Sequence, residues 1–428
     1  MIQIQEEERK SKVILVGVNQ QGDLEFDHSM EELKSLAEAC DMEPVARMDQ
    51  NVSEMNHTYY VGKGKVEEIG ERAKSLEAEY IIFNNSLSPS QLRNLQKEIP
   101  AALLDRTSLI LEIFKRRAKT REAKMQVEMA ELQYMLPRLS GMGTTLSRQG
   151  GASGSLSSKG AGEKKLELDR RKIEKRISEL RRALEEIDRD KDTQRKRRNT
   201  SSLPKVALVG YTNGGKSTLM NKMLEFCSQK EEKMVMAKDM LFATLDTTVR
   251  KICPGENKDF LLSDTVGFVS SLPHHLIQAF QSTLDEVRYA DLLLHVVDFS
   301  NVHYKEQMRV TRETLEELGA GMIPTIYVMN KADKVMDKED IPKIVENKIY
   351  MSVKEGKGLE QLLHIIQEKA YASYIDTCFF IPYSCGGIVS YLNENAQVKS
   401  QEYASKGVKM DVRCHEKDYR KYGEYVVK

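Results

Sequence analysis

The sequence lacks the features that would place the chain in a membrane or in an oxidising compartment. No stretch reaches the roughly 18 uncharged apolar residues that a membrane span needs. The six cysteines stand apart, with no Cys-x-x-Cys pair, so neither a disulfide framework nor a zinc site is expected. The opening residues MIQIQEEERK lack the basic start and apolar run of a signal peptide. We therefore expect a cytoplasmic protein with reduced thiols and no membrane span.

An excess of charge of one sign is also lacking, because 65 basic residues balance 65 acidic ones. The balance hides an uneven distribution: the net charge is −9 over residues 1–114, +11 over residues 115–198 and −2 over residues 199–428. A basic middle segment between acidic or near-neutral flanks is typical of a contact with a polyanion. A solvated charged helix is the other interpretation, and the run Arg195–Lys196–Arg197–Arg198 favours the phosphate contact.

At 428 residues, the chain is too long for one ordinary core, and its patterns predict four parts. The predicted parts are an α/β domain at 1–107, a helical hairpin at 108–200, a nucleotide-binding domain at 201–372 and a small α+β domain at 373–428. In the first part, strands are expected at 12–18, 44–48, 59–61, 80–84 and 101–105, with helices over 30–40, 64–76 and 88–98. In the last part, strands are expected at 378–383, 409–414 and 422–427, around a helix near 386–394.

The hairpin is predicted from apolar residues spaced three and four apart. The steps of seven, four, three, four and three that follow Leu166 fit the seam of a coiled coil; the residues are Leu166, Ile173, Ile177, Leu180, Leu184 and Ile187. The facing helix is expected to present Met125, Met129, Leu132 and Leu136. Between the helices, the glycine- and serine-rich loop 140–162 is either a flexible linker or a tip that becomes ordered on a partner.

A phosphate-binding loop is expected at residues 210–217. The apolar run KVALVG at 205–210 predicts a strand, and GYTNGGKS follows it as a complete G-x-x-x-x-G-K-S motif before a helical stretch. The glycines let backbone amides turn towards phosphate, the lysine places a charge on the β and γ oxygens, and the serine hydroxyl is a ligand for Mg²⁺. The residues expected to contact the nucleotide are Gly210, Tyr211, Thr212, Asn213, Gly214, Gly215, Lys216 and Ser217.

A second motif follows the strand DFLLSD at 259–264. Asp264 ends this strand and is expected to hold Mg²⁺ through a water molecule. The amide of Gly267 is expected to read the γ-phosphate, and Thr265 and Val266 lie between the two. Phe268 comes next, where small signalling GTPases use a glutamine to orient water, so the chain alone is expected to hydrolyse GTP slowly.

Two further motifs predict that the base is guanine. Asp333 follows the strand TIYVMN at 325–330, and its carboxylate can accept hydrogen bonds from guanine N1–H and the N2 amine, a donor pair that adenine lacks. The residues expected around the base are Asn330, Lys331, Ala332 and Asp333, with Ser352, Val353 and Lys354 on its far side. All of these motifs end strands, which is where doubly wound sheets bind ligands. The predicted fold class is therefore α/β, with a P-loop GTPase domain built on a mostly parallel sheet.

A mobile segment between residues 217 and 264 is expected to supply a further ligand to Mg²⁺. The segment FATLDTT at 242–248 contains three threonines, of which Thr244 is the expected ligand, ordered only when the γ-phosphate is present. Its neighbours expected at the nucleotide are Phe242, Ala243, Leu245 and Asp246. The expected catalytic groups are Lys216, Thr244 and Gly267. Asn213 either binds a potassium ion beside the phosphates or only shapes the loop.

With these residues in hand, the chain resembles the HflX family of ribosome-associated GTPases over nearly its whole length. Outside the GTPase motifs, the resemblance rests on YVGKGKVEEI (60–69), SLSPSQLRNLQKEI (86–99), the segment 103–139, SGMGTTLSRQGG (140–151), LELDRRKIEKRI (166–177) and LFATLD (241–246). The resemblance implies a protein that binds the large ribosomal subunit in its GTP form and separates stalled or idle ribosomes into subunits. It also implies that the hairpin reaches ribosomal RNA near the peptidyl transferase centre.

The sequence departs from the family pattern at several positions. The glycine-rich loop reads GGASGSLSSKGAGEKKLELDRR and lacks the family's arginine and proline, and Thr247 stands where proline is usual. Gly214 replaces alanine, and SVK replaces SAK at 352–354. None of these departures removes a ligand, so guanine nucleotide binding is expected to persist. The free chain is expected to be a monomer.

Two other functions are consistent with the sequence. One is an ATP-driven RNA remodeller with a second nucleotide site around GKGK at 62–65, although this cluster lacks the frame of a P-loop. The other is a GTP-gated scaffold for a partner other than the ribosome.

Overall fold

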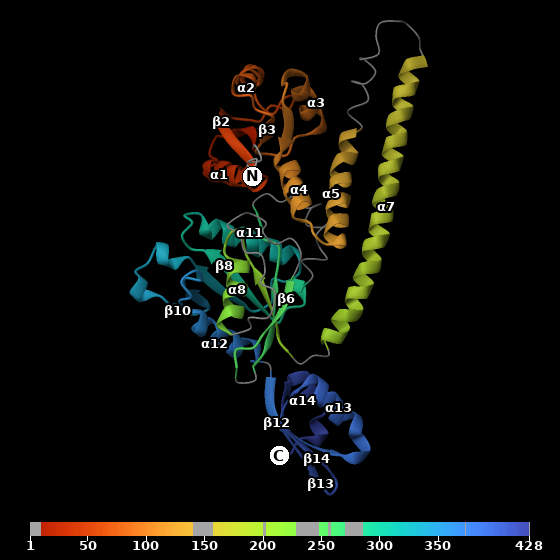
Figure 1. The fold of residues 1–428 in the computed structure, drawn as a ribbon, viewed down its shortest axis with the longest axis vertical. Helices are drawn as coiled ribbons and strands as arrows, with labels where there is room; N and C mark the ends of the chain where they lie inside the picture. Colours follow the sequence, from red (N-terminus) through yellow and green to blue (C-terminus); the bar gives the residue numbers. More distant parts are fainter. Residues whose placement is uncertain are drawn as a thin grey trace, which may run out of the picture. The chain divides into compact units, whose positions relative to one another are not determined.

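The computed structural model describes residues 10–139, 157–199, 203–227, 248–255, 258–269, 286–372 and 374–427 (Figure 1). By their internal contacts, most described residues up to Glu185 form one compact unit and most of those from Glu186 onward form another. Within these described ranges, no helix is both long and apolar enough to cross a membrane.

The first unit begins with a four-stranded parallel sheet of order β2-β1-β3-β4. Its strands are β1 (Ser11–Gln20), β2 (Met42–Val52), β3 (Tyr80–Phe83) and β4 (Ala102–Asp105). The helices are α1 (Phe26–Ala39), α2 (Lys63–Leu76), α3 (Pro89–Glu98) and α4 (Arg106–Arg117). Apolar residues of the central strands, such as Ile14 and Ile81, are fully buried between the helices. The alternation of strands and helices is confirmed.

The strand expected at 59–61 is wrong. The φ angle of Tyr60 is 71°, a left-handed conformation that interrupts an extended strand. The side chain of Asn56 closes a turn instead, because its Oδ1 accepts hydrogen bonds from the amides of Thr58 (2.8 Å) and Tyr59 (3.0 Å). The ring of Tyr60 is nevertheless buried, which explains why the segment is apolar without being a strand.

Two further helices of the predicted hairpin are α5 (Arg121–Leu139) and α7 (Ser157–Asn199). On α7, Ile177 and Leu180 are buried, as the seam predicts. On α5, the buried apolar residues are Ala123, Val127 and Ala130, whereas the expected seam residues Met125, Met129, Leu132 and Leu136 are half-buried. The difference arises because α5 packs against α4. Residues 140–156 of the predicted loop lie outside the described residues, and residues 157–162 belong to α7.

The second unit contains a seven-stranded sheet of order β10-β11-β9-β8-β5-β7-β6. Its strands are β5 (Lys205–Val209), β6 (Thr248–Ile252), β7 (Phe260–Asp264), β8 (Leu292–Asp298), β9 (Thr325–Asn330), β10 (Lys343–Val345) and β11 (Lys348–Tyr350). The edge strands β6 and β10 run antiparallel to their neighbours, and the strands between them are parallel. The helices are α8 (Lys216–Phe226), α11 (Tyr304–Glu317) and α12 (Leu359–Ala370), with short 3-10 turns η1 (Ala332–Lys334) and η2 (Lys338–Asp340). The predicted α/β fold with a mostly parallel sheet is confirmed.

The last described residues form a three-stranded antiparallel sheet of order β12-β14-β13 with its own core. The elements are β12 (Tyr374–Pro382), η3 (Tyr383–Cys385), α13 (Gly386–Asn395), β13 (Gln397–Ala404), β14 (Gly407–His415), α14 (Glu416–Lys421) and η4 (Gly423–Tyr425). The strand expected at 422–427 is wrong, since these residues hold a 3-10 turn and only Val426 bridges to Phe379. The strand β13 was missed, because its sequence QVKSQEYA is mostly polar.

Candidate guanine nucleotide site

The loop between β5 and α8 is pressed against the neighbouring strands. Gly210 has a φ of 139°, and a Cβ there would lie 2.3 Å from the carbonyl oxygen of Val296 on β8. Gly215 has a φ of 100°, and a Cβ there would lie 2.3 Å from Nδ2 of Asn330 on β9. Only glycine fits at these two positions, in agreement with the role predicted for them in a phosphate-binding loop.

The side chain of Lys216 lies inside this loop. Its Nζ donates hydrogen bonds to the carbonyl oxygens of Gly210 and Tyr211, both at 2.9 Å, and the residue is only 7% exposed. Burial removes water from the ammonium and lowers its pKa to about 8, while the carboxylate of Asp264 opposes the shift. Because α8 also begins at this lysine, a positive charge and the N-terminal end of a helix dipole share one place. Such a place favours an anion.

Asp264 and Ser217 meet directly at the end of β7. The Ser217 hydroxyl donates to Oδ2 of Asp264 at 2.6 Å, and the aspartate is fully buried. A hydroxyl and a carboxylate are the hard oxygen donors that Mg²⁺ prefers. The residues present therefore fit a magnesium ion beside the phosphate cradle.

The segment after Asp264 lies against the phosphate loop. A Cβ at Gly267 would lie 2.9 Å from Nζ of Lys216, so its backbone is adjacent to the buried ammonium. Phe268 is only 3% exposed; its amide donates to Gly210 O at 3.2 Å, and its carbonyl accepts from the Thr212 amide at 2.8 Å. Where small signalling GTPases have a glutamine that orients water, this chain has a phenyl ring, which has no hydrogen-bonding atom.

Asn330 joins the phosphate loop to the expected base-binding loop. Its Nδ2 donates to the carbonyl of Gly214 at 2.9 Å. Its Oδ1 accepts from the amides of Lys331 at 2.8 Å and Val353 at 3.0 Å. The side chain is buried, so these bonds form in a low dielectric and hold both loops in register.

The other residues predicted to contact the base lie in the two loops that Asn330 joins. Nζ of Lys331 donates to Oδ2 of Asp298 at 2.7 Å and to the carbonyl of Asn213 at 3.1 Å. Asp333 lies on η1, half-buried, and its carboxylate has no hydrogen-bond partner within the part of the chain that the structure describes. Ser352 and Val353 are buried, and Lys354 is exposed.

The structure thus brings the predicted segments 210–217, 264–267, 330–333 and 352–354 to the carboxyl ends of the parallel strands. The predicted residues Phe242, Ala243, Thr244, Leu245 and Asp246 lie outside the described residues.

Two residues of the site were missed from the sequence. Asp298 was detectable as the polar end of an apolar strand, the same signal that identified Asp264. His295 is buried on β8, and burial, together with the charge of Lys216, lowers its pKa to about 3. It is therefore neutral at physiological pH, and no spacing rule distinguishes it from an ordinary core residue.

Three family models match successive segments of the chain between residues 27 and 331. They are described as GTP-binding GTPase N-terminal (residues 27–115), GTP-binding GTPase Middle Region (117–198) and 50S ribosome-binding GTPase (205–331). A GTPase HflX of Caldanaerobacter subterraneus is 40% identical over 411 residues, covering 96% of this chain and 92% of that protein. A GTPase HflX of Escherichia coli is 37% identical, covering 92% of this chain and 91% of that protein. A GTP-binding protein of Sulfolobus solfataricus, solved with GDP, is 24% identical with a TM-score of 0.45, covering 84% of this chain and 99% of that one.

Proposed function

The chain belongs to the HflX family of GTPases, and from this premise we propose that it binds the large ribosomal subunit in its GTP form and separates stalled or idle ribosomes into subunits. The observation that carries the proposal is the extent of the similarity: the family match includes the N-terminal domain and the basic hairpin as well as the GTPase domain. A GTPase domain alone would predict GTP hydrolysis but would not identify a partner. GTP hydrolysis then releases or resets the protein. A cytoplasmic location is part of the same proposal.

The phosphates are held by the loop 210–217 in this proposal. Lys216 turns from the carbonyls of Gly210 and Tyr211 towards the β and γ oxygens, which supply the negative charge that its buried ammonium lacks. The amides of the loop and of the first turn of α8 donate to the same oxygens. Gly267 offers its amide to the γ-phosphate from the side of Lys216.

The base is selected by Asp333, whose carboxylate accepts hydrogen bonds from guanine N1–H and the N2 amine. The hydrogen bonds of the neighbouring residues Asn330 and Lys331 support this role of Asp333. Asn330 fixes the loops on both sides, and the pairing of Lys331 with Asp298 and Asn213 aligns the stem of Lys331 along the site. Ser352, Val353 and Lys354 border the base from the opposite side.

Ser217 and Asp264 would hold Mg²⁺, the serine directly and the aspartate through water, with Thr244 of the segment 242–248 as the further ligand. A bound Mg²⁺ neutralises the charge that develops on the β and γ oxygens during hydrolysis. Asn213 belongs to the same phosphate loop and has a left-handed backbone conformation. We include a potassium ion at its side chain in the proposal. Equal rates of hydrolysis in potassium and sodium buffers would contradict that ion.

Phe268 implies that hydrolysis depends on a partner. The phenyl ring cannot orient water, and the backbone of Phe268 is bound on both sides to the phosphate loop. Docking on the ribosome supplies the missing orientation or charge in this proposal. Single-turnover GTP hydrolysis should therefore accelerate when large subunits are added. An unchanged rate would contradict the dependence of hydrolysis on the ribosome.

The test of the whole proposal is sedimentation with ribosomes. The protein with a non-hydrolysable GTP analogue should move with large subunits and convert 70S particles into subunits, while the protein with GDP should stay at the top of the gradient. A protein that stays out of the ribosomal fractions with both nucleotides would instead be a scaffold for another partner. Tight ATP binding by a fragment of residues 1–200 would favour the RNA remodeller.

A further inference from the structure

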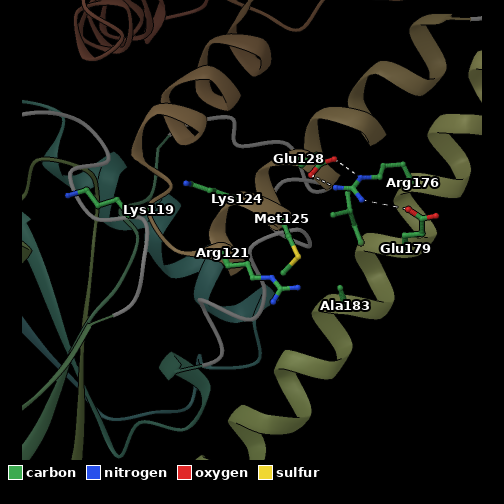
Figure 2. A pocket seen from close by; sticks show the side chains of 9 residues that line it. Lys119, Arg121, Lys124, Met125, Glu128, Arg176, Glu179 and Ala183 are labelled. Carbon is green, nitrogen blue, oxygen red and sulfur yellow. Dashed lines mark hydrogen bonds and ion pairs between the residues drawn. The ribbon is translucent and has the colours of Figure 1, made fainter.

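The side chain of Thr212 is a buried polar group of the phosphate loop. Polar side chains in contact normally pair, as in the groove between α5 and α7, where Figure 2 shows the Arg176 guanidinium bonded to the carboxylate of Glu128. The same holds for the fully buried Thr265, directly after β7, whose Oγ1 donates to the carbonyl of Leu208 at 2.6 Å. Thr212 is only 7% exposed, yet its Oγ1 has no hydrogen-bond partner in the part of the chain that the structure describes.

Such a hydroxyl does not contribute to the stability of the fold. A buried hydroxyl without a partner is destabilising, because its lost hydrogen bonds to water are not replaced. Valine has almost the same shape as threonine and would fill this place without a polar atom. An unsatisfied buried group in a native structure therefore calls for another explanation, and a catalytic role is one of them. Here, a partner that arrives with the nucleotide would satisfy the hydroxyl.

Thr212 lies where the γ-phosphate is expected. A Cβ on Gly267 would lie 2.7 Å from Cγ2 of Thr212 and 2.9 Å from Nζ of Lys216, so both side chains border the same point. The amide of Thr212 also donates to the carbonyl of Phe268 at 2.8 Å. This bond fixes the backbone of Thr212 against the segment that contains Gly267 and Phe268.

A rotation of its side chain would bring the hydroxyl of Thr212 to this point. The methyl group Cγ2 faces Gly267, and one step between staggered χ1 angles exchanges the methyl group with the hydroxyl. Thr212 precedes α8, so it is free of the restriction that a helix places on the χ1 angle of threonine. A hydroxyl can accept a hydrogen bond from a water molecule and donate one to a phosphate oxygen. The phenyl ring of Phe268 can do neither.

We propose that Thr212 is a further catalytic residue, whose hydroxyl orients the water that attacks the γ-phosphate. The inference rests on the proposed nucleotide site and concerns hydrolysis by the chain itself, before any partner acts. The water oxygen bonds to the γ-phosphorus while the bond from this phosphorus to the β–γ bridging oxygen breaks. The electron pair of that bond leaves with GDP, and one water proton passes to the released phosphate. Thr212 keeps its own proton, so it acts by orientation alone, in agreement with slow hydrolysis.

The test compares three variants of the full-length chain in single-turnover GTP hydrolysis without ribosomes. Thr212→Val removes the hydroxyl, and Thr212→Ser keeps it. Thr311→Val is the matched control, since it removes a buried hydroxyl of α11 that donates to Gln307 O at 2.9 Å. At saturating GTP, Thr212→Val should be about tenfold slower, as expected for one hydrogen bond made in the transition state. Thr212→Ser should recover most of the rate, and Thr311→Val should match the wild type.

Two further measurements separate catalysis from a structural role. A non-hydrolysable GTP analogue should bind Thr212→Val nearly as tightly as the wild type, because the lost bond acts mainly in the transition state. The thermal midpoint of nucleotide-free Thr212→Val should equal or exceed that of the wild type, because an unpaired hydroxyl has been removed. If Thr212→Val does not fold, the rate of Thr212→Ala takes its place.

Three results would overturn the inference. They are an unchanged rate in Thr212→Val, an equal loss of rate in the valine and serine variants, and a loss that weaker binding of the analogue explains in full. A wild type that hydrolyses GTP at a rate that large subunits do not change contradicts the ribosomal part of the proposed function. The variants decide the role of Thr212 in that case as well.

Discussion

At the scale of single residues, Lys216 is under strong electrostatic constraint in the nucleotide site. It is buried, its hydrogen bonds are to neutral carbonyls, and its pKa is about 8 instead of 10.5. A nucleotide brings phosphate charge next to the ammonium and raises this pKa again. In the free protein the Lys216 ammonium therefore donates its hydrogen bonds to neutral carbonyls, and the nucleotide phosphates supply a negatively charged partner.

The first prediction is that GTP binding takes up a proton near pH 8. The pKa of Lys216 is lower in the free protein than in the complex, so binding is strongest when the lysine is already protonated. Affinity should therefore hold below pH 8 and fall about tenfold by pH 9, because one pH unit above the free pKa corresponds to one decade. Calorimetry in buffers of different ionisation enthalpy measures the uptake. Guanosine, which lacks phosphates, is the control, and an uptake that is equal for both ligands would contradict the explanation.

Asn330 gives the second prediction. Asn330→Ala leaves the Gly214 carbonyl and the Val353 amide buried without a partner, and each such group costs about 1–3 kcal/mol. The free energy of unfolding of the GTPase domain should fall by about 3 kcal/mol, and GDP affinity should fall with it. Denaturant titration measures the first effect. Asn393→Ala is the matched control, at an exposed helical asparagine whose side-chain Nδ2 donates to Val389 O, and should change little.

At the scale of elements, predictability follows how local the determinants are. The phosphate loop could be predicted because its glycines, lysine and serine are adjacent in sequence and each has a separate physical role. The turn at Tyr60 could not be predicted. A buried apolar residue gives the same sequence pattern whether it belongs to a turn or to a strand. β13 was missed because its pairing with β14, and not its own pattern, determines its conformation.

The hairpin shows the same limit and gives the third prediction. The spacing located Ile177 and Leu180 on the buried face of α7, but it could not show that α5 turns Ala123, Val127 and Ala130 inward. Leu180→Ala should lower the local stability of α7 by about 3 kcal/mol, through lost burial and a cavity. Hydrogen exchange of the α7 amides measures this. Leu168→Ala, at a leucine 50% exposed on the same helix, should leave exchange nearly unchanged. Equal effects would show that the buried face is misplaced.

At the scale of the whole molecule, the chain joins parts with separate cores. The buried cluster of the seven-stranded sheet and that of residues 374–427 share no residue. The four-part division of the chain remains a prediction, and one consequence of it can be measured. Ending the chain after residue 372 should leave GDP affinity within about twofold of the full-length value, because the two parts have separate cores. A large loss would show that the C-terminal sheet supports the nucleotide site.

The segments 210–217, 264–267, 330–333 and 352–354 of the candidate site were predictable, because each carries a short motif that follows a strand and parallel strands end at one edge of a sheet. What the sequence could not give is the way they are joined: Asn330 bonds to Gly214 and to Val353, residues far from it along the chain. The close approach of Gly267 to Lys216 likewise joins segments far apart along the chain. Such bonds depend on strand order, which follows from the packing of the sheet.

Equilibrium binding of GDP, ADP and xanthosine diphosphate tests most directly whether Asp333 selects guanine. The wild type should bind GDP far more tightly than ADP. Asp333→Asn should weaken GDP about a hundredfold, since two charge-assisted hydrogen bonds are lost, and should improve binding of xanthosine diphosphate, whose oxygen replaces the guanine amine. Asp337→Asn, at an exposed aspartate four residues along, should match the wild type. A preference for ADP, or equal GDP affinity in wild type and Asp333→Asn, would contradict guanine selection by Asp333.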